Sequence, residues 1–487
     1  MPLIDIPVIA LLPPLSATIR SPQSKRPFRC VIVASGWLAV VLSVVLTIGC
    51  GRQSDRVGED SILTEHQGMN AEQFLRSVFS RYRNAESYRD RGQVRLNYRS
   101  GGKTQSEVAP LSVWFDRDSL YLNAYDVHLR STPQNLTAWI TDPTTRNFDS
   151  QVVRTDSQSG RPAIHAMLSD TVLRERIAAG LAGPPPQLEW LFAAEPMERL
   201  FDGPYQIAFG KPVTFEQQEC VVVVVQADED AYRFAIEERS GVIRQVQLPS
   251  LRAPVRYQTA GDASESSPIR LTLDLAGATF ESPQDQPTLE PLPRLPRFVS
   301  HFIPLPPDQP SETLDTRLAS FKIRDQSGRI TMTHRGIDGV DFTLLLFAND
   351  RPSDLVSAAN LIQWAVAMPA DMRTKVAVGI VTDETAFRRL PRDCPAPLFI
   401  DAEVDTGVTV QQTVGAASGQ LVVISRDARI VWIQDSVSID SIARLGRVVG
   451  DLIDGVDVPA RLRSQWQSDE STYQSVLNAE VARQQQH

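Results

Sequence analysis

The stretch "LLLFANDRPSD", from Leu344 to Asp354, runs from an apolar segment into polar residues that favour a turn and a helix start. Its unbroken apolar part predicts a strand buried on both faces. The next residues, "DLVSAANLIQWAVAM", have helical apolar spacing. Farther along, "KVAVGIVTD" predicts a second buried strand, "GQLVVISRDARIVWIQ" a hairpin and "SIDSIARLGRVVGDLI" a helix. This order predicts an α/β domain over residues 318–457.

These segments resemble the TlpA-like thioredoxin family, which has "FWAxWCxPC" after its first strand and "PTTFLIDRDGRIV" at its hairpin. The resemblance implies a thioredoxin-like fold for residues 318–457. Arg351 and Asp354 stand at the two cysteine positions, and Gly419 stands where the family has its cis-proline. Because the family's chemistry needs a thiolate as the attacking group, we expect a redox-inactive domain without catalytic residues.

Composition excludes several classes of function. A net charge of −9 and a pI near 5.4 argue against nucleic-acid binding, which needs a basic face. The four cysteines form no CxxC, and the six histidines form no HExxH. We therefore expect no disulfide framework, metal site or cofactor.

The N-terminal region has the pattern of an export signal. Four basic residues precede an uncharged run from Cys30 to Cys50, namely Arg20, Lys25, Arg26 and Arg29. A basic segment, an apolar run and small residues before a cut site typify such signals. The end of the run, Leu46 to Cys50, resembles a bacterial lipobox, which implies lipidation of Cys50; the alternative is an uncut transmembrane anchor. Both place the rest of the chain in the cell envelope, facing the periplasm or exterior. Residues 1–50 are thus the predicted leader and 51–69 a flexible tether.

Residues 70–282 predict an α+β domain: a helix with Asn70 as N-cap, followed by many strands. The run "CVVVVV", Cys220 to Val225, is apolar on both faces of its strand. Such a strand is either covered on both sides or lines an apolar cavity.

The order helix, "SY" (Ser87-Tyr88), strands and "YRFAIEERSGVIRQVQLP" resembles the LolA-like lipoprotein carriers and a related sensor that restrains an anti-sigma factor. The resemblance implies an antiparallel half-barrel that binds acyl chains under a helical lid. By this analogy an apolar cavity is lined by Trp114, Leu120, Leu122, Trp139, Trp190, Phe192, Val223 and Val225.

Two segments read as unstructured connections. Prolines recur over residues 283–317, which predicts a semi-rigid linker. Residues 458–487 are mostly polar and read as a C-terminal tail. The predicted class is therefore α+β: a LolA-like half-barrel followed by a thioredoxin-like α/β domain.

The leading functional hypothesis is a non-catalytic, membrane-anchored envelope protein. It would bind an acyl chain, a lipoprotein or another protein partner through the half-barrel. A first alternative is a thiol-dependent oxidoreductase or peroxidase that uses the lone Cys394, which would need an accessible thiol of low pKa. A second alternative is an envelope-stress sensor or scaffold, which the sequence does not separate from the first hypothesis.

Overall fold

The structure is a computed structural model that describes residues 65–100, 103–157, 160–227, 230–250, 269–282, 290–324, 330–383, 386, 397–400 and 408–486. The predicted leader, Cys50 and most of the predicted tether lie outside these residues, as does Cys394. Among the helices described, none has the length and apolarity needed to span a bilayer.

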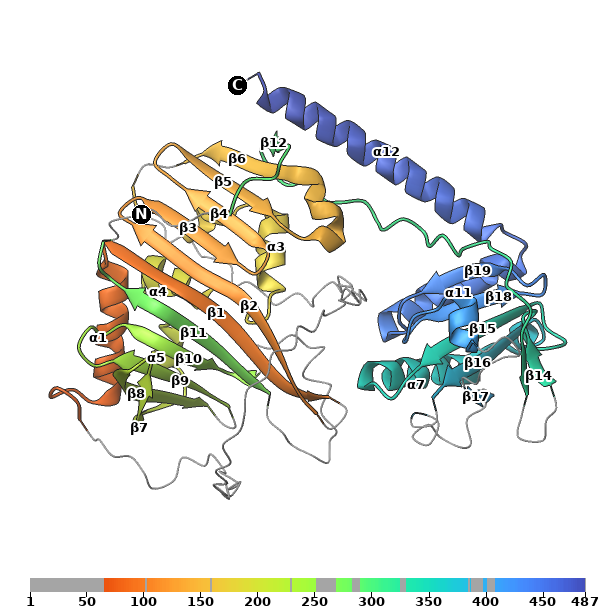
Figure 1. The fold of residues 1–487 in the computed structure, drawn as a ribbon, viewed down its shortest axis with the longest axis horizontal. Coiled ribbons are helices and arrows are strands. Elements are labelled where there is room, and N and C mark those ends of the chain that lie inside the picture. Colours follow the sequence, from red (N-terminus) through yellow and green to blue (C-terminus); the bar gives the residue numbers. More distant parts are fainter. Residues whose placement is uncertain are drawn as a thin grey trace, which may run out of the picture.

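A twelve-stranded sheet dominates the first part of the chain (Figure 1). Its order is β12-β6-β5-β4-β3-β2-β1-β11-β10-β9-β8-β7, and every pair is antiparallel except β12 with β6. The strands are β1 (Ser87–Ser100), β2 (Lys103–Asp116), β3 (Ser119–Ala124), β4 (Val127–Ser131), β5 (Asn135–Ile140), β6 (Gln151–Asp156), β7 (Gln206–Phe215), β8 (Gln218–Ala227), β9 (Asp230–Glu237), β10 (Ile243–Leu248), β11 (Arg270–Thr279) and β12 (Arg297–Val299).

Helices cover one face of this sheet, here called the inner face, and enclose the largest hydrophobic core with it. The longest is α1 (Ala71–Asn84), and the predicted N-cap is confirmed because the Asn70 side chain accepts a hydrogen bond from the Gln73 amide. A 3-10 segment, η1, spans Pro143–Ser150. The other helices are α2 (Ile164–Met167), α3 (Thr171–Ala178), α4 (Pro186–Phe192) and α5 (Arg199–Asp202).

Strand β8 is buried on both faces, as its sequence predicts. Val221, Val223 and Val225 belong to the inner-face core. Cys220, Val222 and Val224 point the other way and are also buried. We call the sheet and its helices the large-sheet unit.

A second, five-stranded sheet has the order β17-β16-β15-β18-β19, and its elements follow the predicted order. Strands β15 (Phe342–Ala348), β16 (Val376–Thr382) and β17 (Leu398–Ile400) are parallel, whereas β18 (Leu421–Ser425) and β19 (Ile430–Gln434) form an antiparallel hairpin. A separate hairpin pairs β13 (Lys322–Arg324) with β14 (Ile330–Thr333). The helices are α7 (Pro352–Ala367), α8 (Ala370–Arg373), α10 (Val410–Val414) and α11 (Ile439–Ile453). We call these elements the small-sheet unit.

With this helix and strand content and its large open sheet, the chain is an α+β protein.

The predicted linker is more ordered than its prolines suggest. Residues 297–299 form β12, and the following Phe302 and Ile303 are buried in the large core. Farther on, the Asp315 amide donates to the Ile430 carbonyl at 2.6 Å, so the chain runs along the edge of β19. Proline is tolerated at the edge of a sheet because it lacks only the backbone N–H donor. The linker thus contacts both sheets, through β12 and through Asp315.

The predicted C-terminal tail is instead a 27-residue helix, α12 (Val458–Gln484). It begins after Asp457, whose side chain accepts a hydrogen bond from the Ala460 amide. Two of its few apolar residues, Tyr473 and Leu477, are buried in the large core. Because polar residues outnumber them, the sequence shows almost no amphipathic pattern.

Candidate functional site

The structure does not bring all eight predicted cavity residues together. Leu120, Leu122, Trp190, Val223 and Val225 belong to the inner-face core, and Phe192 packs at its margin. The neighbours of Trp114 and Trp139 along their strands point inward, so these two side chains lie on the outer face. Trp114 contacts Tyr121 there, at 4.9 Å between ring centroids, and Trp139 stacks on His128 at 5.3 Å. Side chains alternate between the two faces of a strand, so this alternation in the sequence could have assigned both tryptophans to the outer face.

Aromatic side chains fill the space between the sheet and its helices. The Trp190 ring on α4 lies 5.5 Å from Tyr82 and 6.2 Å from Phe79, both on α1. Phe79 in turn meets Phe234 of β9 edge-on at 5.7 Å. All four rings are fully buried. In this conformation the inner face is closed.

A buried carboxylate lies within this apolar layer. The pairing of β1 with β2 is interrupted between Arg89 and Gln93. Here Asp90 Oδ1 accepts hydrogen bonds from the backbone amides of Gly92, at 2.9 Å, and Val113, at 3.0 Å. The side chain therefore replaces missing ladder bonds. Burial raises the pKa of Asp90 from 3.8 to about 6, partly offset by those hydrogen bonds.

Helix α4 is tied to this carboxylate by Gln187, which is fully buried. Its Nε2 donates to the Leu111 carbonyl at 2.9 Å and approaches Asp90 Oδ2 at 3.4 Å. Two nearby polar atoms have no hydrogen-bond partner among the described residues: Gln187 Oε1 and Trp190 Nε1. Burial also raises the pKa of Tyr88, and the charge of Asp90 adds to this shift. Unpartnered buried polar groups cost stability, so this core is not optimised for stability alone.

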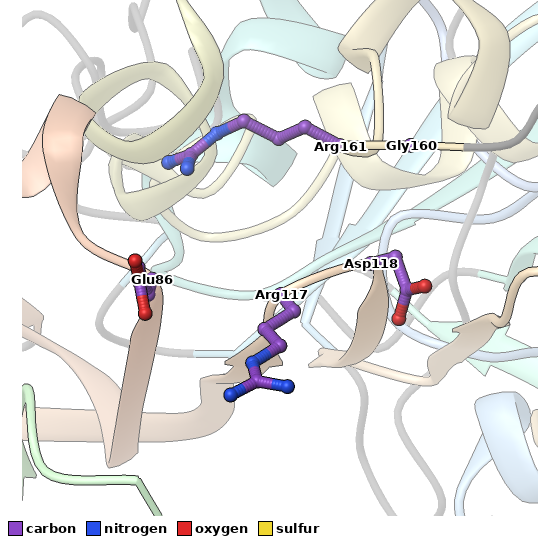
Figure 2. Close-up of a pocket in the computed structure, with 5 residues that line it drawn as sticks. All are labelled: Glu86, Arg117, Asp118, Gly160 and Arg161. Atoms are coloured by element: carbon purple, nitrogen blue, oxygen red, sulfur yellow. The ribbon is translucent and has the colours of Figure 1, made fainter.

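Arg161 fastens the end of α4 to the end of α1. Its guanidinium donates to the Ala85 carbonyl at 2.9 Å and to the Leu191 carbonyl at 2.7 Å. It also lies over the Phe115 ring, 4.8 Å from the centroid, and burial lowers its pKa. Figure 2 shows Arg161 at an open cavity of about 420 Å³, which is lined also by Glu86, Arg117, Asp118 and Gly160.

Helix α3 is held by further polar contacts. Arg176 forms ion pairs with Asp126 and Asp142, which precede β4 and η1. The Tyr125 hydroxyl donates to the Gly183 carbonyl at 2.6 Å, in the loop between α3 and α4. We call residues 164–202, which contain α2 to α5, the lid. Sequence reasoning missed Asp90, Arg161 and Gln187, because none belongs to a motif.

Arg351, Asp354 and Gly419, the three positions compared with the thioredoxin motif, lie close together in the small-sheet unit. Arg351 is the exposed residue that precedes α7, whereas Asp354 is 4% exposed. Asp354 accepts hydrogen bonds from the Asn349 amide at 3.1 Å, the Ser353 hydroxyl at 3.2 Å and the Ser418 hydroxyl. Its carboxylate therefore joins the start of α7 to the loop before β18.

Gly419 lies directly beside this carboxylate. Its φ of +83° suits glycine, and a Cβ there would lie 3.0 Å from Asp354 Oδ1. Its amide donates to the Phe347 carbonyl at 2.6 Å. The only cysteine in the described part of the chain, Cys220, is buried in β8 of the other unit. Nor do the described residues contain a group of three or more side chains able to hold a metal ion.

No known family model and no curated protein matches the chain. Similar solved structures include MucB of Pseudomonas aeruginosa in complex with MucA, 10% identical, covering 53% of this chain and 73% of that chain with a TM-score of 0.22. A provisionally described outer membrane lipoprotein-sorting protein domain of Vibrio parahaemolyticus is 9% identical and covers 45% and 96%, with a TM-score of 0.19. A provisionally described protein disulfide isomerase of Bacteroides thetaiotaomicron is 17% identical and covers 28% and 88%, with a TM-score of 0.23. At these TM-scores the likenesses assign no function to the chain.

Proposed function

We propose that this chain is a non-catalytic envelope protein that binds an acyl chain, of a lipid or a lipid-modified protein, on the inner face of its large sheet. The lid closes this site in the described conformation. The basic residues and apolar run before Cys50 support the envelope location.

The observation that carries the proposal is the construction of the lid. Short helices cover an apolar sheet face and are fastened by separate polar contacts: Gln187 with Leu111, Arg161 with Leu191, Arg176 with Asp126 and Asp142, and Tyr125 with Gly183. Polar atoms without partners lie beneath α4. A layer built only for stability would be apolar or fully hydrogen-bonded. A lid that is held over an apolar surface by separate side-chain contacts can open when those contacts break. The surface exposed by opening is apolar, and an apolar acyl chain would cover it favourably.

The small-sheet unit supports the non-catalytic part of the proposal. Asp354 stands where the resembling family has a cysteine, and its oxygens join the start of α7 to the loop before β18. A carboxylate in that role supplies no electrons to a disulfide. We infer that this unit serves binding or positioning rather than redox chemistry.

Copurification tests the proposal directly. Native mass spectrometry of the full chain extracted from membranes should detect bound acyl species, and a fluorescent fatty acid should bind and be displaced by unlabelled fatty acid. Gln187→Ala removes one fastening and should favour lid opening by about 1–2 kcal/mol, a roughly five- to thirtyfold change in the opening equilibrium. Uptake of the probe should accelerate accordingly.

The matched control is Gln245→Ala. Gln245 also donates a side-chain hydrogen bond, to Asp274 Oδ1 at 2.7 Å, but it joins β10 to β11 rather than the sheet to the lid. This variant should take up the probe at the wild-type rate. Absence of copurified acyl species, together with no probe binding by the wild type or by Gln187→Ala, would overturn the proposal.

A further inference from the structure

Helix α12 begins on the small-sheet unit, where Val458 is buried in its core, and the C-terminal half of the helix docks on the large-sheet unit (Figure 1). Leu477 is fully buried and Tyr473 is 5% exposed, both within the large core. The Gln151 side chain at the start of β6 donates to the Tyr473 hydroxyl at 3.1 Å and to the Ile303 carbonyl at 3.0 Å. One glutamine therefore joins α12, the linker and the sheet edge.

Charged contacts surround this docking site. Arg146 of η1 donates to both carboxylate oxygens of Glu470, at 2.6 and 3.0 Å. One turn beyond Leu477, Glu480 accepts from the amide of Ser300, at 3.0 Å, and from its hydroxyl, at 2.6 Å. Hydrogen bonding to Ser300 lowers the pKa of Glu480. Helix α12 thus holds the linker segment that follows β12.

The same linker segment contacts the lid. The Phe302 amide donates to Asp170 Oδ2 at 2.7 Å, while Asp170 Oδ1 accepts from the Leu173 amide at 2.9 Å as the N-cap of α3. The Phe302 ring packs edge-on against Phe148 of η1 at 5.6 Å. A continuous series of contacts therefore runs from α12 through the linker to α3 of the lid.

We propose that α12 is a releasable clamp: docked, it holds the lid closed through the linker and Asp170, and undocked, it frees the lid to open. The proposal deepens the proposed function and rests on it. Two features suit release. The helix is largely polar, and Val458 in its first turn is buried in the core of the small-sheet unit, so the C-terminal half can leave the large sheet while the start of the helix stays attached. The small-sheet unit, which carries α12, would then govern ligand access.

Hydrogen exchange of adjacent aspartate substitutions tests the clamp. Leu477→Asp places a charge in the docking site and should undock α12, whereas Val476→Asp introduces the same charge at a position that is 49% exposed. In the full chain, backbone amides of α3 and α4 should exchange about tenfold faster in Leu477→Asp. Amides of β8 and β9, at the other end of the sheet, should keep their wild-type rates in both variants.

Asp170→Asn tests the connection without disturbing the helix. Asparagine is as good an N-cap as aspartate, so its side-chain oxygen can still accept from Leu173. Its amide nitrogen, however, cannot accept from Phe302. This variant should accelerate exchange in α3 and α4 while the amides of α12 remain protected.

The exchange measurements test the clamp independently of whether an acyl ligand binds. Faster exchange confined to the lid supports it, even if no acyl ligand is ever found. Unchanged lid exchange in Leu477→Asp overturns it, and so does equal acceleration in β8 and β9, because α12 would then be a general part of the core. Absence of ligand binding in every variant overturns only the proposed function.

Discussion

At the scale of single residues, the interrupted pairing of β1 depends on Gly92. A Cβ at this position would lie 2.1 Å from the Leu111 carbonyl oxygen, so the two backbones come too close for any side chain. We expect Gly92→Ala to lower the free energy of unfolding by about 1–3 kcal/mol, as overpacking does. Urea titration measures this. The control is Gly450→Ala in α11, where nothing lies within 4 Å and alanine should stabilise the helix slightly.

Asp90 should make the stability of the large-sheet unit fall as pH rises. Its pKa is about 6 in the folded chain against 3.8 in the reference state. Between these values the folded protein keeps a proton that the unfolded chain has released, so the free energy of unfolding falls by about 1.4 kcal/mol per pH unit. Stability from this group is complete below pH 4 and is lost above pH 6.

Comparison with Asp90→Asn isolates the contribution of Asp90, because the other groups with shifted pKa values are present in both proteins. The asparagine oxygen can still accept from Gly92 and Val113, and the variant has no carboxyl group to titrate. We expect the variant to gain about 3 kcal/mol relative to the wild type between pH 4 and pH 7. Urea titrations at both pH values measure the difference. A constant difference would show that Asp90 is not the titrating group.

At the scale of elements, Asp354 fastens α7 to the loop before β18. Asp354→Ala should leave the Asn349 amide and two serine hydroxyls without their acceptor. We expect a loss of about 1–3 kcal/mol in the stability of the small-sheet unit, measured by thermal unfolding. Asp427→Ala, in the exposed turn between β18 and β19, should change stability by less than about 0.5 kcal/mol. An equal effect of both substitutions would contradict the role given to Asp354.

How much of each element the sequence predicts depends on the strength of its local pattern. The strand over Leu344 to Ala348 and helix α7 are strongly apolar, so their type and order could be predicted. The buried run in β8 could also be predicted. The linker and α12 could not, because their order comes from distant partners: residues 297–299 gain order by pairing with β6, and α12 by inserting Tyr473 and Leu477 into a remote core. Propensity reports local preference, and tertiary contacts override it.

The candidate site illustrates the same limit at the level of side chains. Sequence pattern places Trp190, Val223 and Val225 in the apolar layer because hydrophobicity alone determines that position. It does not identify Asp90 or Gln187, whose importance arises only when β1 and α4 meet. Arg161 likewise acquires its role from two helix ends, at Ala85 and Leu191, that are far apart in the chain. Such contacts are products of topology.

At the scale of the whole molecule, the last helix and the first sheet form one core. This arrangement makes the stability of the large-sheet unit depend on residues that follow the small-sheet unit. The ion pair between Arg146 and Glu470 is partly exposed, with side chains 43% and 22% accessible. Exposed pairs contribute about 0–1 kcal/mol, so the apolar contacts of Tyr473 and Leu477 supply most of the docking energy.

Leu477→Ala should therefore lower the free energy of opening at the β6 and β12 end of the large sheet by about 2–5 kcal/mol, the range for buried leucine truncation. Glu470→Ala should lower it by less than about 1 kcal/mol. Exchange of the β6 amides measures this opening, and urea titration followed by exchange of the β8 and β9 amides shows whether the whole sheet is affected. If Leu477→Ala instead destabilises only the small-sheet unit, α12 belongs energetically to the domain it follows, and its contacts with the large sheet contribute little. The expected result would mean that the β6 and β12 end of the large sheet reaches its full stability only while the helix that joins the two units is docked.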